Sequence, residues 1–81
     1  MRIDKFLKNS RLIKRRTVAK EACDQERVSL NGKIVKAGAE VNPEDEIHIE
    51  FGNSSLDVKV LQLLESCKKE DAVKMYELIG E

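Results

Sequence analysis

Apolar positions in the first third of the chain recur with the spacing of helices. Ile3, Phe6 and Leu7 follow the i, i+3, i+4 rule, which predicts a short amphipathic helix over about the first nine residues. Asn9-Ser10 interrupts this pattern, and a second helix is predicted from about Lys14 to Gln25. The apolar arc of this second helix consists of Val18, Ala19, Ala22 and Cys23. We expect the two helices to pack through their apolar faces.

The middle of the chain begins with a hairpin pattern. Two short apolar segments, Val28-Ser29-Leu30 and Ile34-Val35, flank Asn31-Gly32. That dipeptide favours a tight turn, because both of its residues tolerate positive φ. A further turn is predicted over Asn42-Pro43-Glu44-Asp45, since proline presets φ at the second position of a turn.

Two strands and a helix are predicted to follow. Ile47, Ile49 and Phe51 alternate with polar residues, Gly52 to Ser55 is expected to turn the chain, and alternation resumes over residues 56–60. From about Lys69 the helical spacing returns, with Ala72, Met75, Tyr76 and Ile79 on one face. The predicted order is two helices, three or four short antiparallel strands and a helix. Such a separation of helices and strands along the chain is typical of an α+β domain.

The length and composition set limits on the class of protein. A chain of 81 residues has room for one small domain. None of its apolar runs approaches the roughly 18 residues that span a bilayer, so no membrane contact is expected. The N-terminal residues lack the apolar stretch of a secretory signal, which favours a cytoplasmic protein. Reduced thiols fit that compartment; Cys23 is expected in the core and Cys67 at a boundary position.

Catalysis and metal binding have little support in the sequence. An active site needs convergent acids, bases or nucleophiles, and the lone His48 points outward in its predicted strand. Two distant cysteines and one histidine do not make a metal site. The acidic run at 44–46 is interpreted as a solvated turn, because neighbouring residues there point in different directions. We therefore expect no enzymatic activity, no metal and no cofactor.

The charges are distributed very unevenly along the chain, although the net charge is zero. Residues 1–20 hold eight basic side chains and one acid, Asp4, giving +7. Residues 21–40 carry −1, residues 41–60 carry −4 and residues 61–81 carry −2. A basic segment on a neutral protein indicates a directed contact with a polyanion.

The two predicted helices can bring basic side chains onto one surface. Arginine forms forked hydrogen bonds to phosphate oxygens, and each phosphate contacted releases condensed counterions. Charge alone does not separate RNA from DNA. For A-form RNA, recognition should rest on backbone shape and 2′-hydroxyls. The basic side chains expected on this surface are Arg2, Arg11, Arg16 and Lys20.

Several spaced motifs within residues 1–51 resemble the S-four RNA-binding domain. They are Arg2-Ile3-Asp4-Lys5-Phe6-Leu7, Ser10-Arg11-Leu12, Arg16-Thr17-Val18-Ala19-Lys20 and Val28-Ser29-Leu30-Asn31-Gly32. The resemblance implies two helices packed on a small antiparallel sheet, with RNA bound on the helix side and Asp4 orienting the neighbouring arginines. It makes residues 1–51 the RNA-binding domain and residues 52–81 a C-terminal strand and helix extension of it. The candidate RNA-binding residues are Arg2, Asp4, Arg11, Lys14, Arg15, Arg16, Lys20, Lys33 and Lys36.

The chain departs from the family pattern at three positions. The family usually has a small residue where this chain has Arg15, and glycine where it has Glu26 and Glu44. Glycine supplies positive φ at little cost. Each glutamate therefore indicates either a reshaped turn or a strained residue.

As a single S-four domain that ends in the predicted helix from Lys69, the chain resembles the RqcP (YabO) family. That family is related to the heat-shock protein fifteen family. This resemblance implies a role in ribosome-associated quality control after a stalled ribosome splits. The implied partners are large-subunit rRNA, peptidyl-tRNA, the large ribosomal subunit and RqcH, whose alanine tailing of the nascent chain such proteins support. We expect the chain to act as a monomer.

Two alternatives remain open on the sequence. The first keeps the RNA-binding fold but assigns a heat-shock or ribosome-assembly role without tailing. The second is a protein-interaction module, in which the acidic strands and the C-terminal helix around Tyr76 dock a partner. A third, enzymatic, interpretation has no positive support in the residues.

Overall fold

The computed structural model describes residues 1–64 and 68–79, so the prediction for Cys67 lies outside the described residues. Two helices come first, and a five-stranded antiparallel sheet in the order β2-β1-β3-β4-β5 lies against them. The prediction of an α+β fold is confirmed. The elements are α1 (Ile3–Asn9), α2 (Arg16–Asp24), β1 (Val28–Leu30), β2 (Lys33–Ile34), β3 (Glu46–Phe51), β4 (Ser54–Val60), α3 (Lys69–Ala72) and β5 (Tyr76–Leu78).

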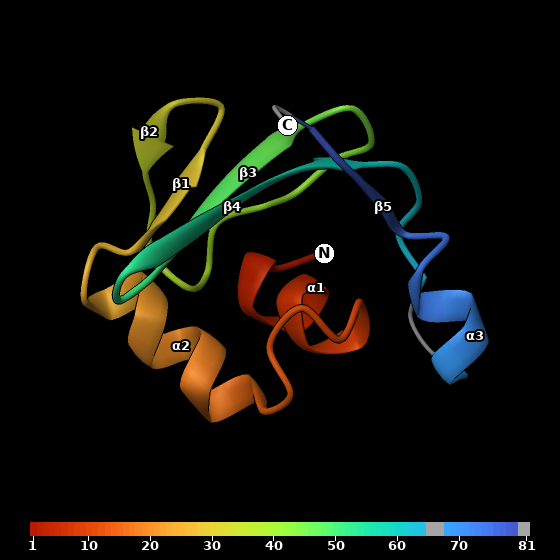
Figure 1. Ribbon diagram of the computed structural model, residues 1–81, viewed down its shortest axis with the longest axis horizontal. Coiled ribbons are helices and arrows are strands. Elements are labelled where there is room, and N and C mark those ends of the chain that lie inside the picture. Colours follow the sequence, from red (N-terminus) through yellow and green to blue (C-terminus); the bar gives the residue numbers. More distant parts are fainter. Residues whose placement is uncertain (65–67, 80–81) are drawn as a thin grey trace.

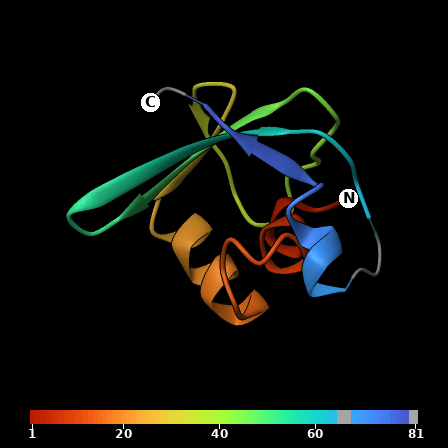
Figure 2. The same ribbon diagram turned by 45° about the vertical axis from the view of Figure 1, so that its right-hand side comes forward.

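The core lies between the helices and one face of the sheet. Helices α1, α2 and α3 lie on the same side of the sheet in both views (Figures 1 and 2). Ile3, Phe6 and Leu7 of α1 are fully buried, as the helical spacing predicted. The side chains that meet them from β3 and β4 are Ile47, Ile49, Val58 and Val60. The opposite face of the sheet has no helix of the described residues against it.

Helix α2 is shorter and more exposed than predicted. It begins at Arg16 rather than Lys14, and its buried residues are Ala19 and Cys23. Val18 was expected in the apolar arc, but its side chain is 48% exposed. The reason is geometric: a helix that rests on α1 along a single strip buries fewer positions than its apolar arc contains.

Both tight hairpins form where the turn residues predicted them. Asn31 and Gly32 have φ values of 51° and 86°, and Ser29 pairs with Ile34 on either side of them. The second hairpin turns within Gly52 and Asn53, because Phe51 pairs directly with Ser54. The predicted turn over Gly52–Ser55 was therefore too long, and both strands extend further than expected.

The C-terminal segment is the main departure from prediction. A helix was expected from Lys69 through Ile79, but α3 ends at Ala72, and Tyr76–Leu78 forms strand β5 on the edge of β4. Ala72 and Met75 are nevertheless buried. The open edge of β4 offers unpaired backbone groups, and pairing with them decides the conformation of a segment whose apolar spacing also fits a helix. Within the described residues the sheet thus has five strands instead of three or four.

The two glutamates at expected glycine positions are strained, and the turns keep their shape. Glu26 (φ 61°) ends α2 in a Schellman motif, with Arg27 N–H donating to Ala22 O at 2.9 Å. Glu44 (φ 78°) is the third residue of a turn closed by Asp45 N–H donating to Asn42 O at 3.1 Å. That position of a type II turn requires positive φ.

Glycine at either position should therefore stabilise the fold. Left-handed backbone costs a residue with a side chain about 1–2 kcal/mol, and the greater freedom of unfolded glycine offsets part of the gain. We expect Glu26→Gly and Glu44→Gly each to raise the free energy of unfolding by about 0.5–1 kcal/mol. Glu21→Gly, inside α2, should lower it by about 1 kcal/mol. Chemical denaturation measures the free energy of unfolding of all three variants. A loss of stability in both turn variants would contradict the inference that Glu26 and Glu44 are strained.

Candidate RNA-binding surface

A buried carboxylate organises the basic helix side of the molecule. Asp4 lies in the first turn of α1, and its side chain is 3% exposed. Its Oδ1 lies 3.3 Å from Arg2 Nε, and its Oδ2 accepts hydrogen bonds from Arg2 Nη2 at 3.4 Å and from Arg16 Nε at 3.3 Å. These three residues are called the Asp4 cluster below. One anion thus holds two arginines, and the cluster retains a net positive charge.

The elements around the cluster fix the direction of each side chain. Arg2 is extended backbone ahead of α1 and forms an isolated antiparallel bridge with Glu40. Arg16 is the first residue of α2, whose packing on α1 brings it across to Asp4. A negative side chain in the first turn of α1 is also favoured by the helix dipole. Both arginine side chains remain about half exposed, so their outer N–H groups face solvent.

The other basic candidates surround the cluster without joining it. Arg11 follows α1 in the left-handed conformation (φ 63°), and Lys14 and Arg15 lie in the link before α2. Lys20 lies one helical turn after Arg16. Each of these side chains is exposed, and within the described part of the chain none of them forms an ion pair. They add positive charge to the helix side and leave it available for a ligand.

The loop after β2 lies against Arg2, a contact that the sequence pattern did not predict. A Cβ on Gly38 would lie 4.0 Å from Arg2 Nη2, and Ile3 N–H donates to Ala39 O at 2.8 Å. Lys36 is exposed at the start of this loop, so it lies close in sequence to the residues beside Arg2. Lys33 is exposed on the edge strand β2, which is separate from the helices. The bridge between Arg2 and Glu40 joins segments far apart in the chain. Local periodicity in the sequence cannot predict such a pairing.

Cys23 is a core thiol, as predicted. It is fully buried on the inner face of α2. Burial raises the pKa of the Cys23 thiol to about 11, and the negative charges of Asp4 and Asp24 act in the same direction. The protonated thiol therefore packs as a small apolar group.

The remaining candidates for chemistry lie away from the helices. His48 points outward from the sheet, as predicted, and its Nδ1 lies 2.7 Å from Asp57 Oδ1. A search of residues 1–64 and 68–79 finds no group of three or more histidine, cysteine and acidic side chains that could hold a metal ion. The helices within the same residues are all too short or too polar to cross a membrane.

Comparison with known proteins agrees with this architecture. The S4 domain family matches residues 1–47. A protein of Streptococcus pneumoniae named RQC P-site tRNA stabilizing factor is 53% identical over 81 residues, which are 100% of this chain and 92% of that protein. The Bacillus subtilis protein of the same name is 52% identical over 100% of this chain and 94% of its own.

A solved structure shows the same fold. The trimeric structure of heat shock protein 15 from Vibrio cholerae superposes with a TM-score of 0.90, over 98% of this chain and 81% of that one, at 21% sequence identity. The chain belongs to the S4 domain family and, within it, to the family of RQC P-site tRNA stabilizing factors. This membership confirms the resemblance that the sequence motifs indicated.

The Asp4 cluster makes a prediction about stability. Asp4→Asn keeps the size of the side chain but removes the anion between two guanidinium groups. We expect the free energy of unfolding to fall by about 1–2 kcal/mol, a value kept modest because the arginines are half exposed. Asp24→Asn, an exposed position on α2, should change it by less than about 0.5 kcal/mol. Equal stabilities of the two variants in guanidinium titrations would show that the cluster does not support the fold.

Proposed function

We propose that this protein is a non-catalytic RNA-binding factor of ribosome-associated quality control. It binds the large ribosomal subunit that carries peptidyl-tRNA after a stalled ribosome splits, and it supports RqcH-dependent alanine tailing of the nascent chain. The observation that carries the proposal is the Asp4 cluster, with its two outward-facing arginines held by one buried carboxylate. The names of the relatives support the assignment to P-site tRNA.

The proposed mechanism follows from how the cluster presents its donors. Asp4 occupies one edge of each guanidinium, which leaves the remaining N–H groups of Arg2 and Arg16 for phosphate oxygens. Because the two arginines come from different elements, one can contact rRNA backbone while the other contacts tRNA backbone. Preorganised side chains lose little rotamer freedom on binding. The factor would thus hold the tRNA against the subunit during each cycle of tailing.

The remaining basic candidates extend this interface. Arg11, Lys14, Arg15 and Lys20 lie on the helix side, and Lys33 and Lys36 lie along the hairpin and the loop beside Arg2. Contacts of this kind strengthen binding through counterion release and carry little sequence information. In this proposal residues 1–51 form the RNA-binding domain and residues 52–81 extend it. The protein acts as a monomer in the cytoplasm, where its ribosomal partners are.

Affinity purification from the host tests the proposal. Tagged wild-type protein should recover large subunits that carry tRNA together with RqcH, identified by RNA sequencing and mass spectrometry. Arg16→Ala should reduce this recovery about tenfold or more, because a charged hydrogen bond to phosphate is lost. Arg27→Ala is the matched control: it removes the same charge from an exposed residue outside the candidate set, and it should leave recovery unchanged.

Two other outcomes would favour the alternative functions. Recovery of mature ribosomes, with alanine tails intact in cells that lack the protein, would favour a heat-shock or assembly role. Recovery of proteins alone, unchanged in Arg16→Ala but lost when Tyr76 is altered, would favour a protein-interaction module. Either result contradicts the quality-control proposal.

A further inference from the structure

The face of the sheet turned away from the helices is unpartnered in the described residues (Figure 1). It is called the outer face here. Cross-strand register defines its composition, because directly paired residues point to the same side. Ile34, Ser29, His48 and Asp57 form one row across β2, β1, β3 and β4. The other rows are Glu50 with Ser55, and Glu46 with Lys59 and Glu77.

The charge of the outer face is opposite to that of the helix side. It carries four carboxylates and one lysine, Lys59, which lies between Glu46 and Glu77. Such a surface repels phosphate and attracts cationic groups. Ile34, 56% exposed, adds an apolar contact to the same face. The composition therefore suits a basic protein surface and excludes the RNA backbone.

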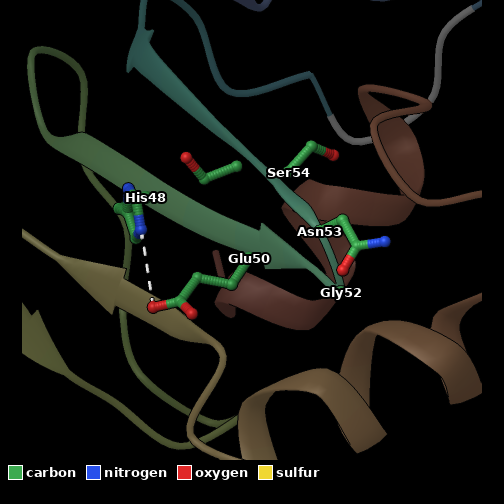
Figure 3. A pocket seen from close by; sticks show the side chains of 6 residues that line it. His48, Glu50, Gly52, Asn53 and Ser54 are labelled. Atoms are coloured by element: carbon green, nitrogen blue, oxygen red, sulfur yellow. Dashed lines mark ion pairs between the residues drawn. The ribbon is translucent and has the colours of Figure 1, made fainter.

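The outer face has a hollow at the end of the β3–β4 hairpin. It is lined by His48, Glu50, Gly52, Asn53, Ser54 and Ser55, and Figure 3 shows Glu50 and His48 at one side of it. Of the two serines in its lining, Ser55 shares the outer face with Glu50, because the two residues are directly paired. The side chain of Glu50 is 61% exposed, so its carboxylate is accessible to a ligand.

The surroundings of His48 identify the most accessible acceptor in the hollow. Its Nδ1 lies 2.7 Å from Asp57 Oδ1 and its Nε2 lies 3.6 Å from Glu50 Oε2, so the ring lies between two carboxylates. Glu50 is the more exposed of the two, at 61% against 47% for Asp57. A guanidinium, with several N–H groups in one plane, can donate to the carboxylate oxygens of Glu50.

We propose that the outer face docks a basic, extended segment of a protein partner, with one arginine side chain seated in the hollow against the carboxylate of Glu50. The occupied face is opposite to the Asp4 cluster. RNA and the basic segment can therefore be bound at the same time, and the chain would join a nucleic acid to a protein. This inference goes beyond the proposed function and does not depend on it.

A peptide titration followed by NMR tests the inference. The probe is an acetylated synthetic peptide of four Arg-Gly repeats, added to the ¹⁵N-labelled full chain. Amide shifts should concentrate at His48, Glu50 and residues 53–55. Glu50→Gln should weaken binding at least fivefold, because the carboxylate partner of the guanidinium is lost. Glu70→Gln, an exposed residue on α3, is the matched control and should change affinity less than twofold.

Three outcomes would overturn the proposal. Equal weakening by Glu50→Gln and Glu70→Gln would mean that the peptide binds acidic side chains indiscriminately. Shifts confined to α3 and β5 would place the site elsewhere. Concentration-dependent shifts at the hollow without peptide would show that a second copy of the chain occupies it. Retained affinity in Arg16→Ala is expected, since that residue lies on the other side of the sheet.

Discussion

The contact of one buried carboxylate with two arginines links the fold of this protein to its binding surface. Asp4 joins the segment before α1 to the first residue of α2, so one anion links the two helices and directs both arginines. A charge this deeply buried is tolerated because it is fully hydrogen bonded, including a backbone bond from Lys5 N–H at 2.8 Å. The half-exposed arginines give the cluster its second role, since their outer N–H groups remain available to phosphates.

The sheet separates the two kinds of surface. Its inner face carries the apolar side chains that α1 and α2 cover, and its outer face carries most of the strand carboxylates. The uneven charge of the sequence thereby becomes a spatial separation, with the basic side chains on the helix side. A net charge of zero conceals this arrangement. The basic side attracts a polyanion, while the acidic side orients the molecule by repelling it.

Local signals in the sequence predicted the elements whose conformation is set locally. The Asn31-Gly32 turn, the α1 core residues and the alternation around Ile49 all formed as expected, because turn chemistry and side-chain periodicity decide them. The segment Tyr76–Leu78 could not be predicted in this way, since pairing with the distant edge of β4 overrides its helical spacing. The candidate site shows the same division: the arginines are visible in the sequence, but the loop that lies against Arg2 is not.

The most direct measurement is a double-mutant cycle between Asp4→Asn and Arg16→Ala. Affinity for purified large subunits that carry peptidyl-tRNA would be measured at several salt concentrations. If Asp4 acts by holding the arginines, each single change weakens binding about tenfold, Arg16→Ala lowers the salt slope by about one unit, and Asp4→Asn costs roughly half as much in free energy once Arg16 is gone. An unaltered affinity in Asp4→Asn, or fully additive effects in the double variant, would contradict the account.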